Sequence, residues 1–172
     1  MNQYKCNIPW TKEFVNNNID IIERNYSLFP TRNQWNCNCH VTHDYDRDVE
    51  PVDFNFLKTE YLKLSNEITK LHNISKFHLS DIWYNYYKEQ QFQEPHIHEG
   101  NNGLTAVHYL IFDPECHSTL QFTDTSIKLP EIECGDIVIF PDSWEHYVPE
   151  NKSNKPRLTT AFTITNDGSP NR

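Results

Sequence analysis

The second half of the sequence is dominated by short segments of alternating residue character, and this alternation restricts the fold more than any other feature. Successive side chains of a β-strand point to opposite faces, so a period of two indicates strands. Pro, Gly, Asp or Asn residues, which favour turns, separate the segments. The segments are DIWYNYYKE (81–89), LTAVHYLIF (104–112), TLQF (119–122), SIKL (126–129), DIVIF (136–140) and RLTTAFTIT (157–165). Many short strands with few helices between them predict a mainly β fold, either a sandwich or a barrel-like jelly roll.

The first half shows helical periodicity instead. Between Asn55 and Asn73, apolar residues recur at intervals of three and four, as an amphipathic helix requires. A weaker pattern of the same kind extends from about Lys12 to Arg24. The apolar positions are Leu57, Tyr61, Leu64, Ile68 and Leu71 in the stronger helix, and Phe14, Ile19 and Ile22 in the weaker one. We expect one domain over residues 1–172, in which helices and loops of 1–79 support a core of strands in 80–165.

Charge and cysteine content exclude several classes of protein. The formal net charge is −9, from 15 basic and 24 acidic residues, so a broad phosphate-binding surface is not expected and a nucleic-acid partner is disfavoured. No apolar run is long enough to cross a bilayer, and we expect a cytoplasmic protein without membrane association. The five cysteines are scattered, which argues against a secreted disulfide framework. The CNCH segment (37–40) lacks a second ligand pair at zinc-finger spacing, so reduced thiols are the better interpretation.

Three histidines form the strongest candidate for a metal site. His96 and His98 differ by two positions, so on a strand both side chains project from the same face, whereas Glu99 points to the other. His146 follows a glycine turn, a strand and a proline. In a jelly roll, strands that are distant in sequence face each other across the interior, so His146 could complete a facial set of three ligands. Surface or core histidines without a metal are the alternative, and one histidine alone would favour it.

Arg157 suggests a second binding function. It opens the segment RLTTAFTIT, where alternation places Arg157, Thr159 and Ala161 on one face. A guanidinium beside a hydroxyl on a rigid strand suits a small dicarboxylate, because the guanidinium can bind a carboxylate with two hydrogen bonds. An ordinary surface arginine is the alternative, but the three candidate metal ligands favour a dicarboxylate-binding role for Arg157.

Two stretches, WYNYYKEQQFQEPHIHEGNNGLTAVHYLIF (83–112) and GDIVIFPDSWEHYVPENKSNKPRLTTAF (135–162), resemble the iron(II)- and 2-oxoglutarate-dependent oxygenases. The resemblance extends over about half of the chain and is closest to a group of small members from tailed phages and marine bacteria. It implies a double-stranded β-helix with N-terminal helices packed on the larger sheet, one iron(II) ion, and 2-oxoglutarate as cosubstrate. It also implies that Arg157 and Thr159 bind the distal carboxylate of 2-oxoglutarate and that Tyr109 assists. The implied activity is hydroxylation of a C–H bond in a peptide or a small molecule.

One position departs from the pattern of that family. The usual first motif is His-x-Asp or His-x-Glu, and His98 stands where the carboxylate is expected. Either three histidines bind the iron, or His98 lies outside the coordination sphere and water or another group replaces the carboxylate. A neutral third ligand would leave the site one charge unit more positive than the common triad.

Two other functions fit part of the pattern. GDIVIFPDSWEH (135–146) approximates a cupin motif, and three-histidine sites are familiar in cupin dioxygenases and isomerases, but the cupin pattern leaves Arg157 unexplained. A metal-free jelly-roll binding module could instead use an aromatic platform for stacking. The candidate platform residues are Trp83, Tyr84, Tyr86, Tyr87 and Trp144.

Overall fold

The structure is a computed structural model and describes residues 4–8, 11–31, 37–43, 49–72, 77–98 and 103–166. Its elements run in the order β-strand, helix, strand, helix and then seven strands. They are β1 (Tyr4–Asn7), α1 (Thr11–Leu28), β2 (His40–Val41), α2 (Asn55–His72), β3 (Phe77–Tyr87), β4 (Gln93–His96), β5 (Leu104–Ile111), β6 (Gln121–Phe122), β7 (Asp136–Pro141), β8 (His146–Val148) and β9 (Arg157–Asn166).

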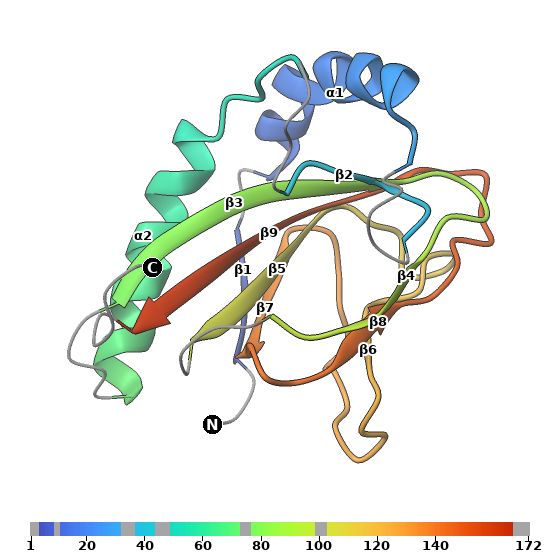
Figure 1. The fold of residues 1–172 in the computed structure, drawn as a ribbon. Helices are drawn as coiled ribbons and strands as arrows, with labels where there is room; N and C mark the ends of the chain where they lie inside the picture. The colour runs from blue at the N-terminus through green and yellow to red at the C-terminus, as the bar shows by residue number, and fades with distance from the viewer. Residues whose placement is uncertain are drawn as a thin grey trace.

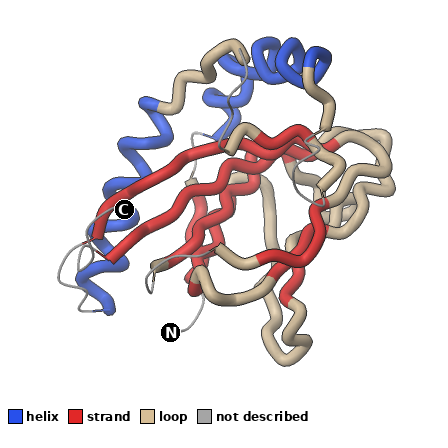
Figure 2. Tube along the Cα trace, viewed as in Figure 1, coloured by secondary structure: helices blue, strands red, loops and turns tan. Residues whose placement is uncertain are grey.

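The strands form two antiparallel sheets (Figures 1 and 2). The larger sheet has six strands in the order β1-β7-β5-β9-β3-β2, and the smaller has three in the order β4-β8-β6. Neighbours in these sheets are far apart in sequence, as in the pairing of β3 with β9. The prediction of a mainly β, jelly-roll architecture is therefore confirmed.

The two helices contribute to the core on one face of the larger sheet, and the smaller sheet faces the other (Figure 1). On the helical side, Tyr61 of α2 stacks on Phe162 of β9, with ring centroids 4.2 Å apart. On the opposite side, Phe140 of β7 packs against Phe122 of β6. The alternation along the strands thus separates two cores, because odd and even positions of one strand enter different layers. Among the described helices, none is both long and apolar enough to cross a lipid bilayer.

Three details of the secondary structure differ from expectation. The short strands β1 and β2 were not predicted, and α1 extends past Arg24 to Leu28. The structure has no strand at 126–129, so that prediction was wrong. A turn forms there instead: the Asp124 carboxylate accepts hydrogen bonds from the backbone N–H and the hydroxyl of Ser126, at 2.9 and 2.7 Å. Such a side-chain bond competes with strand pairing.

Candidate metal and cosubstrate site

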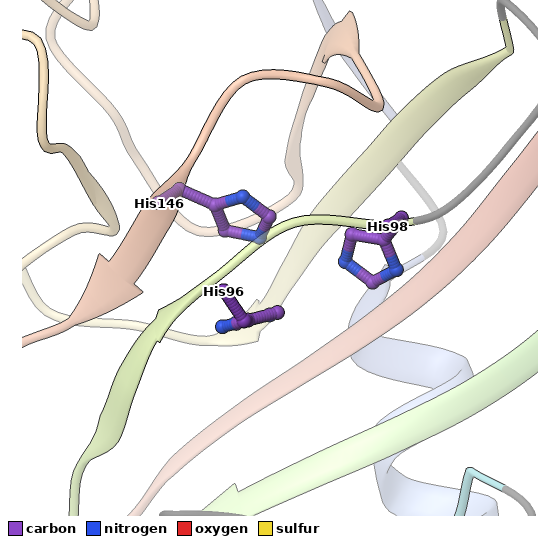
Figure 3. Close-up of side chains that lie close together, drawn as sticks. All are labelled: His96, His98 and His146. Atoms are coloured by element: carbon purple, nitrogen blue, oxygen red, sulfur yellow. The ribbon is translucent and has the colours of Figure 1, made fainter.

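The three predicted histidines meet at one end of the smaller sheet (Figure 3). His96 ends β4 and pairs directly with His146, the first residue of β8. His98 lies two positions beyond His96, outside the strand. The potential ligand atoms of the three rings lie within 4.8 Å of one another. The group could hold one metal ion, whose bonds to imidazole of about 2.0–2.1 Å would bring the ligand nitrogens to within about 4 Å of each other.

His98 reaches this cluster by a different route from the one predicted. The expectation that both histidines lie on one regular strand was wrong, because the pairing of β4 shifts register between Gln93 and His96 and the strand ends before His98. The His98 backbone N–H instead donates to the carbonyl oxygen of Asp142, at 3.1 Å. Its ring packs against Trp83 of β3, with centroids 5.6 Å apart. These contacts with Asp142 and Trp83, and not strand alternation, therefore bring His98 close to the other two histidines.

Two of the histidines have a ring orientation that is set by the backbone. Nδ1 of His96 donates to the carbonyl oxygen of Glu94 at 2.8 Å, and Nδ1 of His146 donates to that of Trp144 at 2.9 Å. A carbonyl oxygen accepts but cannot donate, so Nδ1 carries the proton in both rings. In the neutral ring the lone pair is then on Nε2, and such hydrogen bonds are typical of metal-binding histidines.

All three imidazoles are held in the neutral form. Burial lowers the pKa of His96, and burial with the neighbouring His96 lowers the pKa of His98 to about 4 and that of His146 to about 3. Uncharged imidazoles with free lone pairs are the form that binds metal ions. At neutral pH the cluster therefore presents three nitrogen donors.

A pocket extends from the histidines across the inner face of the larger sheet. It has about 490 Å³ of space, including the open solvent at its mouth. All six residues predicted for the site line it: His96, His98, His146, Tyr109, Arg157 and Thr159. Val107 of β5 and Ala161 of β9, which pair with each other, add apolar surface to its lining. Of the aromatic residues considered for a stacking platform, Trp83 and Tyr87 line the pocket, whereas Tyr84 and Tyr86 lie in the helical core.

Arg157 lies four residues along β9 from Ala161, the residue that pairs with Trp83 beside His98, and it has unused hydrogen-bonding capacity. Its side chain is buried, and its guanidinium carbon lies 4.1 Å from the centre of the Tyr87 ring. Nη1 donates to the carbonyl oxygen of Ser118, but Nε and Nη2 have no partner among the described residues. Burial lowers the pKa of Arg157, yet a guanidinium stays protonated in proteins. A buried cation with two nitrogens that have no hydrogen-bond partner fits a carboxylate ligand, because an unpaired buried charge is costly.

Two polar residues that the sequence did not single out also face this pocket. Asn85 lies opposite Thr159 in the pairing of β3 with β9, and its Nδ2 donates to Thr159 Oγ1 at 3.4 Å. Asn85 Oδ1 and Thr105 Oγ1 are buried without a partner among the described residues. Tyr109 accepts a hydrogen bond from the Leu120 N–H. Strand alternation along 81–89 puts Asn85 on the same face as Trp83 and Tyr87, and this is the one sequence signal that identifies it.

Several other histidines and cysteines have structural surroundings. His108 and His117 bond to neighbouring side chains and backbone, and His40 bonds to Phe29 and Tyr84. The side chains of His72 and His78 lie outside the described part. In the CNCH segment, Cys37 and Cys39 are buried and form no disulfide among the described residues. Across the described residues, the cluster of His96, His98 and His146 is the one group of three with suitable ligand spacing.

Comparisons with known proteins agree with this geometry at the level of the fold. No protein-family model and no curated protein matches the sequence. AviO1 from Streptomyces viridochromogenes Tue57 has a TM-score of 0.70 at 9% identity, covering 99% of this chain and 92% of that one. The viral collagen prolyl hydroxylase vCPH from Paramecium Bursaria Chlorella virus-1, in complex with 2OG, has a TM-score of 0.64 at 13% identity, covering 96% and 97%.

HygX from Streptomyces hygroscopicus, with nickel and 2-oxoglutarate bound, has a TM-score of 0.57 at 12% identity, covering 96% of this chain and 83% of that chain. A second HygX structure also contains hygromycin B. At identities this low the likeness establishes a common fold. The chain thus has the fold seen in 2-oxoglutarate oxygenase structures, and it carries a three-histidine group that could hold a metal ion.

Proposed function

We propose that this protein is an iron(II)- and 2-oxoglutarate-dependent oxygenase that hydroxylates a C–H bond of a small molecule or a peptide. The observation that carries the proposal is that one pocket contains both a candidate metal site and a buried cation. Three neutral imidazoles line this pocket, and so does a buried guanidinium with two nitrogens that have no hydrogen-bond partner. A metal-chelating dicarboxylate is the simplest ligand that uses both.

Each residue has a defined role in this proposal. His96, His98 and His146 would hold the iron(II) ion through ring nitrogens, with the backbone bonds of His96 and His146 fixing the ring orientation. Arg157 would bind the distal carboxylate of 2-oxoglutarate. Thr159 and Tyr109, which line the pocket near Arg157, would offer hydroxyl groups to the same carboxylate.

The bound iron(II) and 2-oxoglutarate would supply oxidation of a C–H bond by dioxygen. The chain's own residues position the reactants and exclude water. Val107, Ala161 and Leu120 line the pocket with apolar surface, which limits the number of waters that could compete for the ligand. The low dielectric around Arg157 also strengthens its attraction for a carboxylate. No side chain is required as a proton acceptor.

The similar solved structures suggest which classes of substrate to test first. The fold is shared with a collagen prolyl hydroxylase and with a protein that holds hygromycin B. Prolyl peptides and aminoglycosides are therefore the first probes for substrate-dependent succinate release.

Arg157→Ala is the test of the cosubstrate site. It removes two charge-assisted hydrogen bonds, each worth about 1.5–3 kcal/mol, so we expect 2-oxoglutarate to bind to the Mn(II)-loaded protein at least about a hundredfold more weakly. Calorimetric titration measures this. Mn(II) affinity should not change, because Arg157 is not among the candidate metal ligands.

Arg157→Lys is the matched control, since it keeps the charge but loses the planar fork. Its affinity for 2-oxoglutarate should be intermediate. Equal 2-oxoglutarate binding by wild type and both variants would contradict the oxygenase assignment. It would favour a cupin-type dioxygenase or isomerase, which needs the three histidines without Arg157.

A further inference from the structure

Asp142 is a buried carboxylate beside the histidines that has no role in the proposed chemistry. It follows directly after β7, and only 4% of its surface is exposed. No ion pair joins it to a cation within the described part of the chain. Its hydrogen bonds come from backbone N–H groups, with Gly103 N 3.0 Å from Oδ2. A carboxylate is costly to bury in this way, so its position requires an explanation.

The contacts of Asp142 join two points of the chain on either side of one segment. Its carbonyl oxygen accepts from His98 N at 3.1 Å, and its backbone N–H donates to the Gly103 carbonyl oxygen at 3.2 Å. The carboxylate adds the third bond, from Gly103 N. His98 is the last described residue before residues 99–102, and Gly103 is the first after them. Asp142 therefore holds both ends of the segment that follows a proposed metal ligand.

Gly103 is the residue type that this arrangement requires. A Cβ atom at position 103 would lie 2.9 Å from Asp142 Oδ2 and 2.8 Å from the carbonyl oxygen of Ile164 in β9. Both distances are shorter than real side-chain contacts. The missing side chain thus lets the carboxylate approach the backbone between β5 and β9.

The same turn also determines the position of His146. Trp144 N donates to the carbonyl oxygen of Pro141 at 3.0 Å, which closes the turn around Asp142. The carbonyl oxygen of Trp144 in turn accepts the His146 Nδ1 proton. One turn between β7 and β8 therefore contacts two of the three histidines, His146 through Trp144 and His98 through Asp142.

We propose that Asp142 is a positioning residue, whose carboxylate fixes His98 relative to His146 by anchoring Gly103. It replaces the strand geometry that would otherwise orient the second histidine, because β4 ends at His96. The inference rests on the proposed metal site, and it requires no contact between Asp142 and the metal.

Mn(II) alone is the probe, with affinity measured by calorimetry and stability by thermal unfolding. Asp142→Ala should weaken Mn(II) binding by about tenfold or more at a temperature well below its unfolding midpoint. Asp142→Asn should lose less, because its amide oxygen can still accept from Gly103 N. The control is Asp136→Ala at the other end of β7, a buried carboxylate paired with Lys5 at 2.8 Å. It should lower the unfolding temperature and leave Mn(II) affinity as in wild type.

The outcomes separate the two proposals. Failure of the wild type to bind Mn(II) would overturn the metal site itself. Wild-type affinity in Asp142→Ala, with a stability loss like that of Asp136→Ala, would overturn the positioning role alone. An equal loss of affinity in Asp142→Asn and Asp142→Ala would also overturn it, since the charge rather than the hydrogen bond to Gly103 would then be responsible.

Discussion

At the scale of single residues, His98 is the feature that most distinguishes this site. The structure brings its ring to the other two histidines, and the ring stacks nearly parallel to that of His146, at an interplanar angle of 14° and with centroids 5.3 Å apart. A third neutral ligand leaves a divalent ion with its full charge, whereas a carboxylate would cancel one unit. Metal affinity in this protein should therefore depend on ring geometry more than on charge, which is consistent with the anchoring of His98 through Asp142.

His98→Asp and His98→Ala separate ligand geometry from charge. We expect His98→Asp to bind Mn(II) within about tenfold of wild type, because the carboxylate is a good ligand for Mn(II) and offsets its shorter reach with charge. His98→Ala should bind at least about tenfold more weakly. Calorimetric titration of the three proteins measures both effects. Unchanged affinity in His98→Ala would show that His98 is not a ligand.

At the scale of elements, a chain of buried hydrogen bonds connects both helices to the larger sheet. His108 of β5 is its centre: Nε2 lies 2.8 Å from Thr11 Oγ1 of α1, and Nδ1 lies 2.8 Å from the Tyr61 hydroxyl of α2. Tyr61 also bonds to Thr160 of β9, and Thr11 donates to the carbonyl oxygen of Ile8. All polar hydrogens of this chain form hydrogen bonds if the Thr160 hydroxyl donates to the Tyr61 oxygen, the Tyr61 hydroxyl donates to Nδ1 of His108, and Nε2 of His108 donates to the Thr11 oxygen. This order requires a neutral His108.

Acid should therefore destabilise the fold through His108. Burial lowers its pKa to about 3, so the unfolded chain takes up a proton below about pH 6.5 that the folded protein does not. The contribution of His108 to the free energy of unfolding is fully present above pH 6.5. It falls by up to about 1.4 kcal/mol per pH unit as the pH is lowered towards 3.

Urea unfolding of the metal-free protein at pH 7 and pH 5 measures this dependence. We expect His108 to account for about 2 kcal/mol of the loss between these values. The control is His108→Gln, which removes the titrating group, so the variant should lose less stability over the same interval. An identical pH dependence in both proteins would contradict the assignment.

The sequence predicted the elements unevenly, and the reason is physical. The long helix α2 and the inner faces of β3, β5 and β9 follow from local periodicity, because each is set by residues close in sequence. The four residues of β1 are a strand because they pair with β7 in the second half of the chain. The role of Asp142 likewise depends on Gly103, 39 residues away, and no local pattern indicates it.

At the scale of the whole molecule, the candidate site joins the two sheets. His96 and His146 come from the smaller sheet, and Arg157, Thr159 and Tyr109 come from the larger one. Buried side chains of both helices share one core with the larger sheet. A ligand that contacts both the histidines and Arg157 can therefore bind only if the two sheets are arranged as in the structure.

Anaerobic titration with iron(II) and 2-oxoglutarate is the direct test of the proposed site. We expect a weak visible charge-transfer band, which arises when the keto acid chelates iron(II), saturating at one iron per chain. His146→Ala should abolish the band, and the next residue provides the control: Tyr147→Phe should keep it, because the Tyr147 hydroxyl bonds to Gln121 outside the pocket. No band in the wild type under saturating iron(II) and 2-oxoglutarate, or an undiminished band in His146→Ala, would contradict the proposed site.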